Sequence, residues 1–222
     1  MNIAELLDDK SLKPKEKTEL LSRWILENPK HIKVILDYAA QAKNPAKATC
    51  IEAFEFATKE NSKLATLELL QFVTLSLSAK APRVKWESAK VIGNIAKHFP
   101  KQLNEGIKSL LVNTEHDGTV VRWSAAYALG EILVLKTPLN SQLIPSIEAI
   151  IQREEKNSIR KIYAATLKKL SMYISIVQYT VLKTRVTTKS TPLVISTDSR
   201  RIFALQGHVP PRPMRTISLH RV

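Results

Sequence analysis

The feature that most constrains this chain is a helical sequence pattern that recurs four times at nearly constant spacing. Segments beginning at Ala46, Val84, Val121 and Ile159 superpose with shifts of 38, 37 and 38 residues. Each segment carries small and apolar residues at the spacing of one helix face. A period of this length predicts stacked supersecondary units rather than a single closed core.

A second set of helical segments lies between the first ones. Residues 101–111 superpose on 141–151 with a shift of 40, and their apolar residues at i, i+4, i+7 and i+8 form one helix face. Asn61, Asn140 and Asn157 are predicted N-caps. The expected helix pairs are 14–27 with 30–42, 46–58 with 62–77, 83–98 with 101–113, and 119–135 with 141–154, followed by a lone first helix at 158–170.

The composition agrees with a helical array whose units share one core. Hydrophobic residues make up 44% of the 222 residues, and there are only 5 glycines, too few for the turns of a many-stranded sandwich. One helical hairpin cannot bury its apolar face alone, so neighbours must stack to stabilise the chain. We therefore predict an all-α fold with a helical array over residues 1–170.

The third segment carries the signature of a known repeat family. Asp117 precedes Val121 and Arg122, which are followed by an alanine-rich stripe and by Leu129 and Gly130. This stretch resembles the HEAT-repeat signature. The resemblance implies a right-handed α-solenoid of about four and a half HEAT-type helical hairpins, with an irregular C-terminal tail. HEAT families differ widely in function, so the resemblance implies a scaffold and not an activity.

One basic residue recurs at the equivalent position of each first helix. This ladder consists of Lys47, Lys85, Arg122 and Arg160. Packed helices lie about 8–10 Å apart, so the ladder would form a line of positive charge that could track a phosphate backbone. The alternative, which the family resemblance implies, is a structural role in which each basic residue bonds an acidic turn residue such as Asp117 or a carbonyl of a neighbouring repeat. We favour the structural role.

In solenoids of this family the second helices usually line the concave face, so their non-core positions form the candidate binding surface. Charges of both signs alternate there, which suits a protein or peptide partner better than DNA. The candidate partner-binding residues are Lys63, Lys101, Asn104, Lys108, Gln142 and Arg153.

Two tryptophans, Trp86 and Trp123, occupy the same position in successive repeats. An aromatic pair beside basic residues can stack on nucleic-acid bases. Repetition at the structural period instead favours packing between repeats, with each indole N–H bonded to a carbonyl. Gly93 and Gly130 lie inside predicted helices, where glycine is less stable than alanine by about 1 kcal/mol, and this predicts close helix approach.

The sequence contains no recognisable catalytic, cofactor or metal-binding motif. The five histidines lack ligand spacing, and there is no glycine-rich phosphate loop. His116 beside Asp117 is the one acid and imidazole pairing, and we interpret it as part of a turn. Cys50 is the single cysteine, so no internal disulfide forms and a cytoplasmic location is expected. No apolar run approaches the length of a membrane span, and the oligomeric state is not predicted.

The composition changes after Leu170. The formal net charge of the chain is +14, and half of it comes from residues 171–222, which hold eight basic residues and one acidic residue. Residues 172–186 have strand propensity. We predict a basic tail of low order over 171–222. Three interpretations of this tail are open: an arm for nucleic acid or an acidic partner, a small hairpin, or an out-of-frame extension. We favour the out-of-frame extension, because the last repeat lacks its second helix.

The function that these features favour is a non-enzymatic HEAT-repeat scaffold that binds a protein partner through its concave surface, without a cofactor. The alternative is a DNA-binding or DNA-repair HEAT-like protein of the alkylpurine glycosylase type, which the size and basicity of the chain allow. A third interpretation is a lyase-type HEAT protein that holds a chromophore. A steep salt dependence of DNA binding would distinguish the second from the first.

Overall fold

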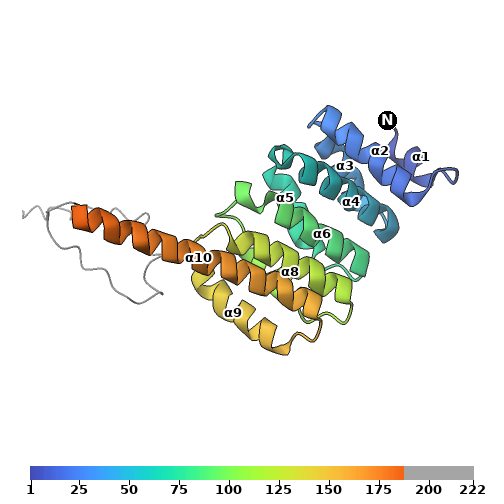
Figure 1. Ribbon diagram of the computed structural model, residues 1–222. Coiled ribbons are helices and arrows are strands. Elements are labelled where there is room, and N and C mark those ends of the chain that lie inside the picture. The colour runs from blue at the N-terminus through green and yellow to red at the C-terminus, as the bar shows by residue number, and fades with distance from the viewer. Residues whose placement is uncertain (188–222) are drawn as a thin grey trace, which may run out of the picture.

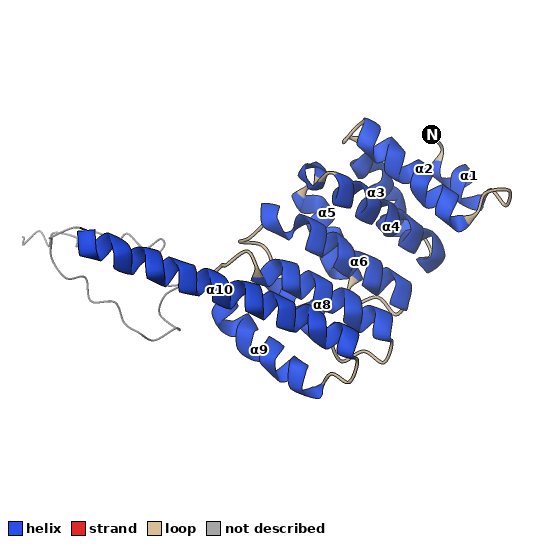
Figure 2. Ribbon diagram, viewed as in Figure 1, coloured by secondary structure: helices blue, strands red, loops and turns tan. Residues whose placement is uncertain are grey.

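The computed structural model describes residues 1–187, with side chains described through Tyr173. Within that part of the chain every regular element is a helix (Figure 2), which confirms the predicted all-α fold. The α-helices are α1 (Ile3–Asp8), α2 (Pro14–Glu27), α3 (His31–Gln41), α4 (Asn44–Glu60), α5 (Leu67–Ser76), α6 (Pro82–Ile95), α7 (Asn104–Asn113), α8 (Thr119–Leu133), α9 (Asn140–Arg153) and α10 (Asn157–Thr187). Two short 3₁₀ turns are η1 (Ser62–Leu64) and η2 (Ala96–His98).

The helices form two layers that are stacked along one direction (Figure 1). Helices α2, α4, α6, α8 and α10 follow one another in what we call the first-helix layer, and α3, α5, α7 and α9 form the second-helix layer. Each second helix also packs against the first helix of the next repeat, so consecutive hairpins are linked. This arrangement is an α-solenoid, as the sequence period predicts.

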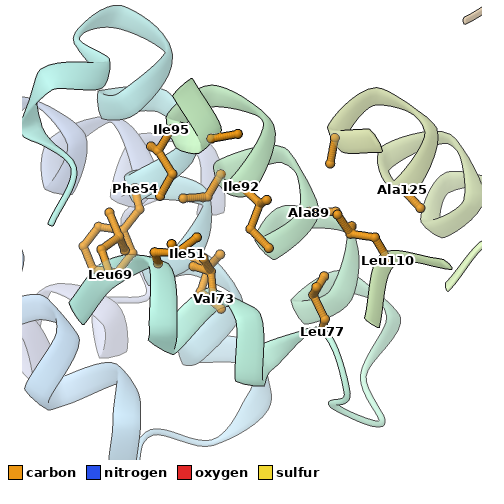
Figure 3. Close-up of a cluster of buried hydrophobic side chains, with 14 of the residues drawn as sticks. Ile51, Phe54, Leu69, Val73, Leu77, Ala89, Ile92, Ile95, Leu110 and Ala125 are labelled. Carbon is orange, nitrogen blue, oxygen red and sulfur yellow. The ribbon is translucent and has the colours of Figure 1, made fainter. Parts of the chain in front are cut away.

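The core lies between the two layers and extends along the whole array. A single cluster of buried apolar side chains reaches from Ile3 to Leu170. Figure 3 shows its middle part, where side chains of α4, α5 and α6 point toward one another. The residues labelled there that are fully buried include Ile51, Phe54, Leu69, Val73, Ile92 and Ile95. Each hairpin therefore supplies only one wall of a shared interior, and burial of that wall stabilises the array by about 25 cal/mol per Å².

Two glycines allow neighbouring first helices to approach closely. A Cβ atom at Gly93 of α6 would lie 2.5 Å from Cε1 of Tyr127 on α8. One at Gly130 of α8 would lie 3.0 Å from Oγ1 of Thr166 on α10. The predicted role of both glycines in close helix approach is confirmed, because a side chain at either position would meet the next helix.

Several element boundaries differ from the sequence-based prediction. The helix predicted at 62–77 is divided into η1 and α5, and the one predicted at 101–113 begins at Asn104. Asn61 caps η1, with its side chain accepting from the amide of Lys63 at 3.2 Å. Asn140 is not an N-cap but the first residue of α9, where it is fully buried and donates from Nδ2 to the carbonyl of Leu133 at 2.7 Å.

The last described helix is longer than the helix that the sequence predicts at 158–170. Helix α10 continues to Thr187 and includes residues 172–186, whose composition favours strands. Strand propensity measures how well side chains fit a sheet surface, and the described part of the chain offers no strand to pair with. The rest of the predicted tail, residues 188–222, lies outside the described residues.

We expect Gly93→Ala to destabilise the protein. The added methyl group collides with the ring of Tyr127, and overpacking of this kind typically costs about 1–3 kcal/mol. The 2.5 Å approach to Cε1 of Tyr127 puts the cost at the upper end of this range, above the gain of about 1 kcal/mol in helix propensity. Chemical denaturation should show a lower free energy of unfolding for the variant.

Gly106→Ala provides the matched control on α7. A Cβ atom there would lie 3.6 Å from Oγ1 of Thr74 and 4.0 Å from Cδ1 of Ile92, which are ordinary contacts. Its unfolding free energy should stay the same or rise. Equal effects of the two substitutions would contradict the close approach at Gly93.

Candidate functional site

The first helices are packed more closely than the second helices. Each first helix contacts the next one along much of its length, whereas successive second helices touch at few positions. The first-helix layer is therefore the more tightly packed of the two layers, and that the second helices line a concave face stays a prediction. The physical reason is the small size of residues such as Ala125, Ala126 and Gly130 where these helices meet.

A chain of polar contacts crosses the surface of this layer near the N-terminus of the array. Glu52 of α4 accepts from the hydroxyl of Thr18 on α2 at 2.8 Å and pairs with Nη2 of Arg83 on α6 at 2.7 Å. The Arg83 and Glu52 side chains are partly buried, 34% and 23% exposed. Three consecutive repeats are thus joined through one carboxylate.

A second polar cluster lies between α4 and α6. Nζ of Lys90 is 2.9 Å from Oε2 of Glu87 and 3.3 Å from Oε2 of Glu55, and both carboxylates are nearly buried. The indole N–H of Trp86 donates to Oε1 of Glu87 at 2.7 Å. Burial raises the pKa of Glu87, and its bonds to Lys90 and Trp86 offset part of that rise. Two buried carboxylates therefore share one lysine.

Tyr127 of α8 is held at the junction with α6. Its hydroxyl donates to Oδ1 of Asn94 at 2.7 Å, and Nδ2 of Asn94 donates to the carbonyl of Glu55 at 3.1 Å and to Oγ1 of Thr58 at 3.2 Å. Burial, followed by the charges of Glu131 and Glu55, raises the pKa of Tyr127 to about 12. The phenol therefore stays neutral at physiological pH and remains a hydrogen-bond donor.

Trp123 stacks on Tyr127 but remains exposed. The two ring centroids are 6.1 Å apart with an interplanar angle of 5°, and Trp123 is 40% exposed. Its indole N–H makes no hydrogen bond within the described residues, so the predicted bond to a carbonyl is wrong for Trp123. It is also wrong for Trp86, whose partner is a carboxylate. We call Trp86, Trp123 and Tyr127 the aromatic strip.

In the basic ladder, two side chains form hydrogen bonds or ion pairs within the described residues and two do not. Nζ of Lys85 donates to the carbonyl of Leu77 at 3.1 Å and to Oδ1 of Asn113 at 3.0 Å. Lys47 is half-buried and Arg160 is exposed, and neither side chain forms a hydrogen bond or ion pair within residues 1–173. The ladder is thus not a continuous line of available charge.

Arg122 makes the densest set of contacts in the ladder. It bonds the carbonyls of His116 and Asp117 at 2.9 and 3.0 Å, and its Nε lies 3.0 Å from Oε2 of Glu154. The acidic partner is therefore buried Glu154 rather than the Asp117 carboxylate. Burial by itself raises the pKa of Glu154, but the amide of Lys156 and the guanidinium of Arg122 outweigh it and hold the pKa below its ordinary value.

Three of the six predicted partner-binding residues share one hollow. Asn104, Lys108 and Gln142 line a space of about 500 Å³ between α7 and α9 whose wall includes Leu111 and Leu143. The other three residues do not line it, and the binding role of all six stays a prediction. Lys63 lies in η1, Lys101 precedes α7, and Arg153 on α9 pairs with Glu115 and bonds Oγ1 of Thr114 at 3.2 Å.

The described residues contain no group of three or more His, Cys, Asp or Glu arranged to hold a metal ion. Nδ1 of His116 accepts from the amide of Gly118 at 2.9 Å, so this imidazole is part of the turn before α8. Burial raises the pKa of the Cys50 thiol to about 12, which keeps it protonated and unreactive. None of the described helices has the length and apolarity needed to span a bilayer.

Comparisons with known proteins support the fold. No protein-family model and no curated protein matches the chain. A designed armadillo repeat protein in complex with the peptide (KR)4 is similar in structure, with a TM-score of 0.57 and 18% identity over 75% of this chain and 79% of that one. A computationally designed armadillo repeat protein for modular peptide recognition gives 0.55 and 16%, over 75% and 79% of the two chains. A structural-genomics engineered protein gives 0.52 and 16%, over 75% and 80%.

These similarities show a helical repeat solenoid. At identities of 16–18% they concern the fold alone and do not distinguish HEAT from armadillo repeats.

We expect Arg122→Ala to lower the free energy of unfolding by about 3 kcal/mol, because it leaves the buried Glu154 carboxylate without its cation. The contribution of ionised Glu154 is present above its ordinary pKa of 4.5 and is lost as the pH falls through the lowered folded value. The difference between wild type and variant should therefore shrink in acid. Urea denaturation at a series of pH values measures it.

Arg160→Ala is the control at the equivalent position of the next repeat. Arg160 is exposed and has no partner among the described residues, so its replacement should change stability by less than about 0.5 kcal/mol. A similar loss in both variants, or a loss independent of pH for Arg122→Ala, would argue against the Glu154 pairing.

Proposed function

We propose that this chain is a non-enzymatic repeat scaffold that binds a protein partner along the first-helix layer. The observation that carries the proposal is the aromatic strip. Trp123 is exposed although its ring is fixed by stacking on Tyr127, which in turn is bonded to Asn94. A large ring that is already ordered loses little entropy on binding, and tryptophan and tyrosine are the residues most enriched in binding hot spots.

A second feature of the first-helix layer supports this proposal. Between α2 and α4 a hollow of about 490 Å³ is lined by Leu26 and Phe56, with charged residues of both signs at its edge. An apolar floor with a charged rim is typical of protein interfaces. The designed armadillo proteins described above include one in complex with a peptide, and that is compatible with peptide binding by a solenoid of this kind.

We further propose that the repeats are of the HEAT type. Each complete repeat of the described chain consists of two α-helices, which is the HEAT pattern, whereas armadillo repeats have three. The segment from Asp117 through Gly130 that resembles the HEAT signature forms the turn before α8 and most of that helix. A cytoplasmic location stays a prediction.

The DNA-binding alternative of the alkylpurine glycosylase type has less support. Its main argument is the basic ladder, and the two central members of that ladder are already bonded to protein groups. Carboxylates such as Glu131 beside the aromatic strip also disfavour a phosphate backbone there. Retention on duplex DNA at low salt, with a steep decrease as salt rises, would revive this alternative.

A display library of random extended peptides, selected on the full chain, tests the proposed function. We expect the selected peptides to bind Trp123→Ala at least about tenfold more weakly, because an anchoring tryptophan typically dominates such an interface. Fluorescence anisotropy with labelled peptides measures the affinities.

Leu75→Ala is the matched control for this experiment. Leu75 is 78% exposed on α5, in the second-helix layer, so its removal deletes an exposed apolar side chain without touching the strip. Selected peptides should bind this variant like wild type. If the selected peptides lose affinity for Leu75→Ala and not for Trp123→Ala, the binding face lies on the second-helix layer.

A further inference from the structure

We infer that one side of α10 is a docking surface for an acidic α-helix of a partner protein. This side is defined by Arg160, Ala164 and Lys168, which we call the α10 strip. It shares no residue with the aromatic strip, so the inference goes beyond the proposed function and does not depend on it.

The α10 strip occupies the position at which earlier first helices accept the next helix. Each of its residues lies 38 positions after a residue of α8, and Lys168 corresponds to Gly130. Gly130 is buried where α8 meets α10, since a Cβ atom there would lie 3.0 Å from Oγ1 of Thr166. Gly93 of α6 is the equivalent residue one repeat earlier, and Tyr127 of α8 covers it. This side of a first helix is therefore a helix-packing surface in two successive repeats.

On α10 the same side is uncovered within the described residues. Helix α10 packs against α8 and α9 and is the last described helix of the first-helix layer (Figure 1). Ala164 is exposed, whereas the equivalent Ala126 of α8 is fully buried. Leu167 adjoins the strip and is only partly buried, whereas the equivalent Leu129 is fully buried. The packing surface of the repeat is thus present on α10 with no described helix against it.

The uncovered side of α10 is cationic. Residues 157–173 contain no acidic residue and four basic ones, Arg160, Lys161, Lys168 and Lys169. All four are exposed, and none forms an ion pair within the described residues. The elements packed against α10 leave this charge in place, because residues 119–156 contain four basic and four acidic residues. A partner surface that carries carboxylates is therefore attracted to this side of α10.

Ion pairs already join consecutive first helices in this array. Arg83 of α6 pairs with Glu52 of α4 at 2.7 Å, and Lys90 of α6 lies 3.3 Å from Glu55 of α4. A basic side chain that faces a carboxylate of the adjacent first helix is thus a contact that this solenoid uses. On α10 the cations lie on the uncovered helix, so the carboxylates have to come from the helix that packs on it.

The charges of the chain disfavour two other occupants of the strip. Residues 188–222 contain six basic residues and one acidic residue, so they have the same sign of charge as the strip. A second copy is disfavoured as well, because each copy has a formal net charge of +14. Nucleic acid has the right sign, but phosphate contacts make no use of Ala164 and Leu167 between the cations. An acidic helix fits both the charge and the packing position.

The test uses the full chain and a labelled, alanine-rich peptide that a hydrocarbon staple holds helical, with two glutamates eight residues apart. This spacing matches Arg160 and Lys168, which are separated by a rise of about 12 Å along α10. We expect binding that weakens as salt rises. The same peptide with glutamines should bind about fivefold more weakly. Fluorescence anisotropy measures the affinities.

A charge exchange locates the binding. The double variant Arg160→Glu with Lys168→Glu should bind the glutamate peptide at least about tenfold more weakly, because two attractions become repulsions. It should prefer a version of the peptide with two lysines, opposite to wild type. Lys80→Glu with Lys97→Glu is the control of equal net charge, since both lysines are exposed and lie outside α10. Its affinity for the glutamate peptide should equal that of wild type.

Ala164→Gln tests whether a helix packs on the strip. The longer side chain hinders close approach without changing the charge, so binding should weaken at least about threefold. Ala165→Gln is the matched control on the adjacent residue, which is exposed and lies outside the strip. This variant should bind like wild type.

Four results would overturn the inference. The glutamate peptide does not bind at any salt concentration, or both double variants weaken its binding equally, which would mean an effect of net charge. Binding survives the double substitution on α10, which would place it on another basic region. Duplex DNA displaces the peptide while Ala164→Gln and Ala165→Gln are alike without effect, which would favour nucleic acid.

The result separates this inference from the proposed function. Trp123 lies on α8, outside the strip, so Trp123→Ala should leave the affinity for the glutamate peptide unchanged. Failure of the α10 surface would leave the evidence for binding at the aromatic strip intact, and the reverse holds as well.

Discussion

The structure depends on the close approach of consecutive first helices. A helical hairpin of this size leaves one apolar wall uncovered, and only a neighbour can cover it. In this chain the neighbours meet where α6 presents Gly93 and α8 presents Gly130. Tyr127 and Thr166 of the next helices occupy the space that a Cβ would need. This arrangement brings the first helices close together. It also determines which residues share the surface of the first-helix layer.

The sequence predicts the fold well because its repeat period and its buried core have one physical cause. Each hairpin buries its apolar face against the next hairpin. Small and apolar residues recur where each repeat meets the next, and so the positions of α4, α6 and α8 follow from the period. The length of α10 could not be predicted in this way. Strand-favouring residues after Leu170 remain helical, because the conformation depends on what is available to pack against and not on composition alone. Buried Asn140 is another such case, since its bond to Leu133 replaces the capping role that its residue type suggests.

The candidate site was harder to predict because the equivalent positions of the repeats have different environments. Trp86 and Trp123 are equivalent in sequence, but Trp86 bonds the neighbouring Glu87. Trp123 has no such partner in the part of the chain that the structure describes, and it stays exposed. Lys85 and Arg160 are equivalent as well, and only the first is bonded within the described residues. A repeat pattern identifies a position within the unit. It does not show which side chains the adjacent repeat places beside that position, and those side chains determine whether the residue is exposed.

The polar contacts between consecutive first helices differ from one repeat to the next, and this difference limits which hairpins can pack together. A chain of similar repeats can mispair by one unit, joining a hairpin to the wrong successor or exchanging hairpins between molecules. Here Glu52 accepts from Thr18 and pairs with Arg83, Lys90 pairs with two glutamates, and the hydroxyl of Tyr127 donates to Asn94. A shift by one repeat would leave nearly buried carboxylates such as Glu55 without a cation, which is strongly unfavourable. Each set of polar contacts can therefore form with one neighbouring helix only, and in this way the contacts determine the order in which the hairpins stack.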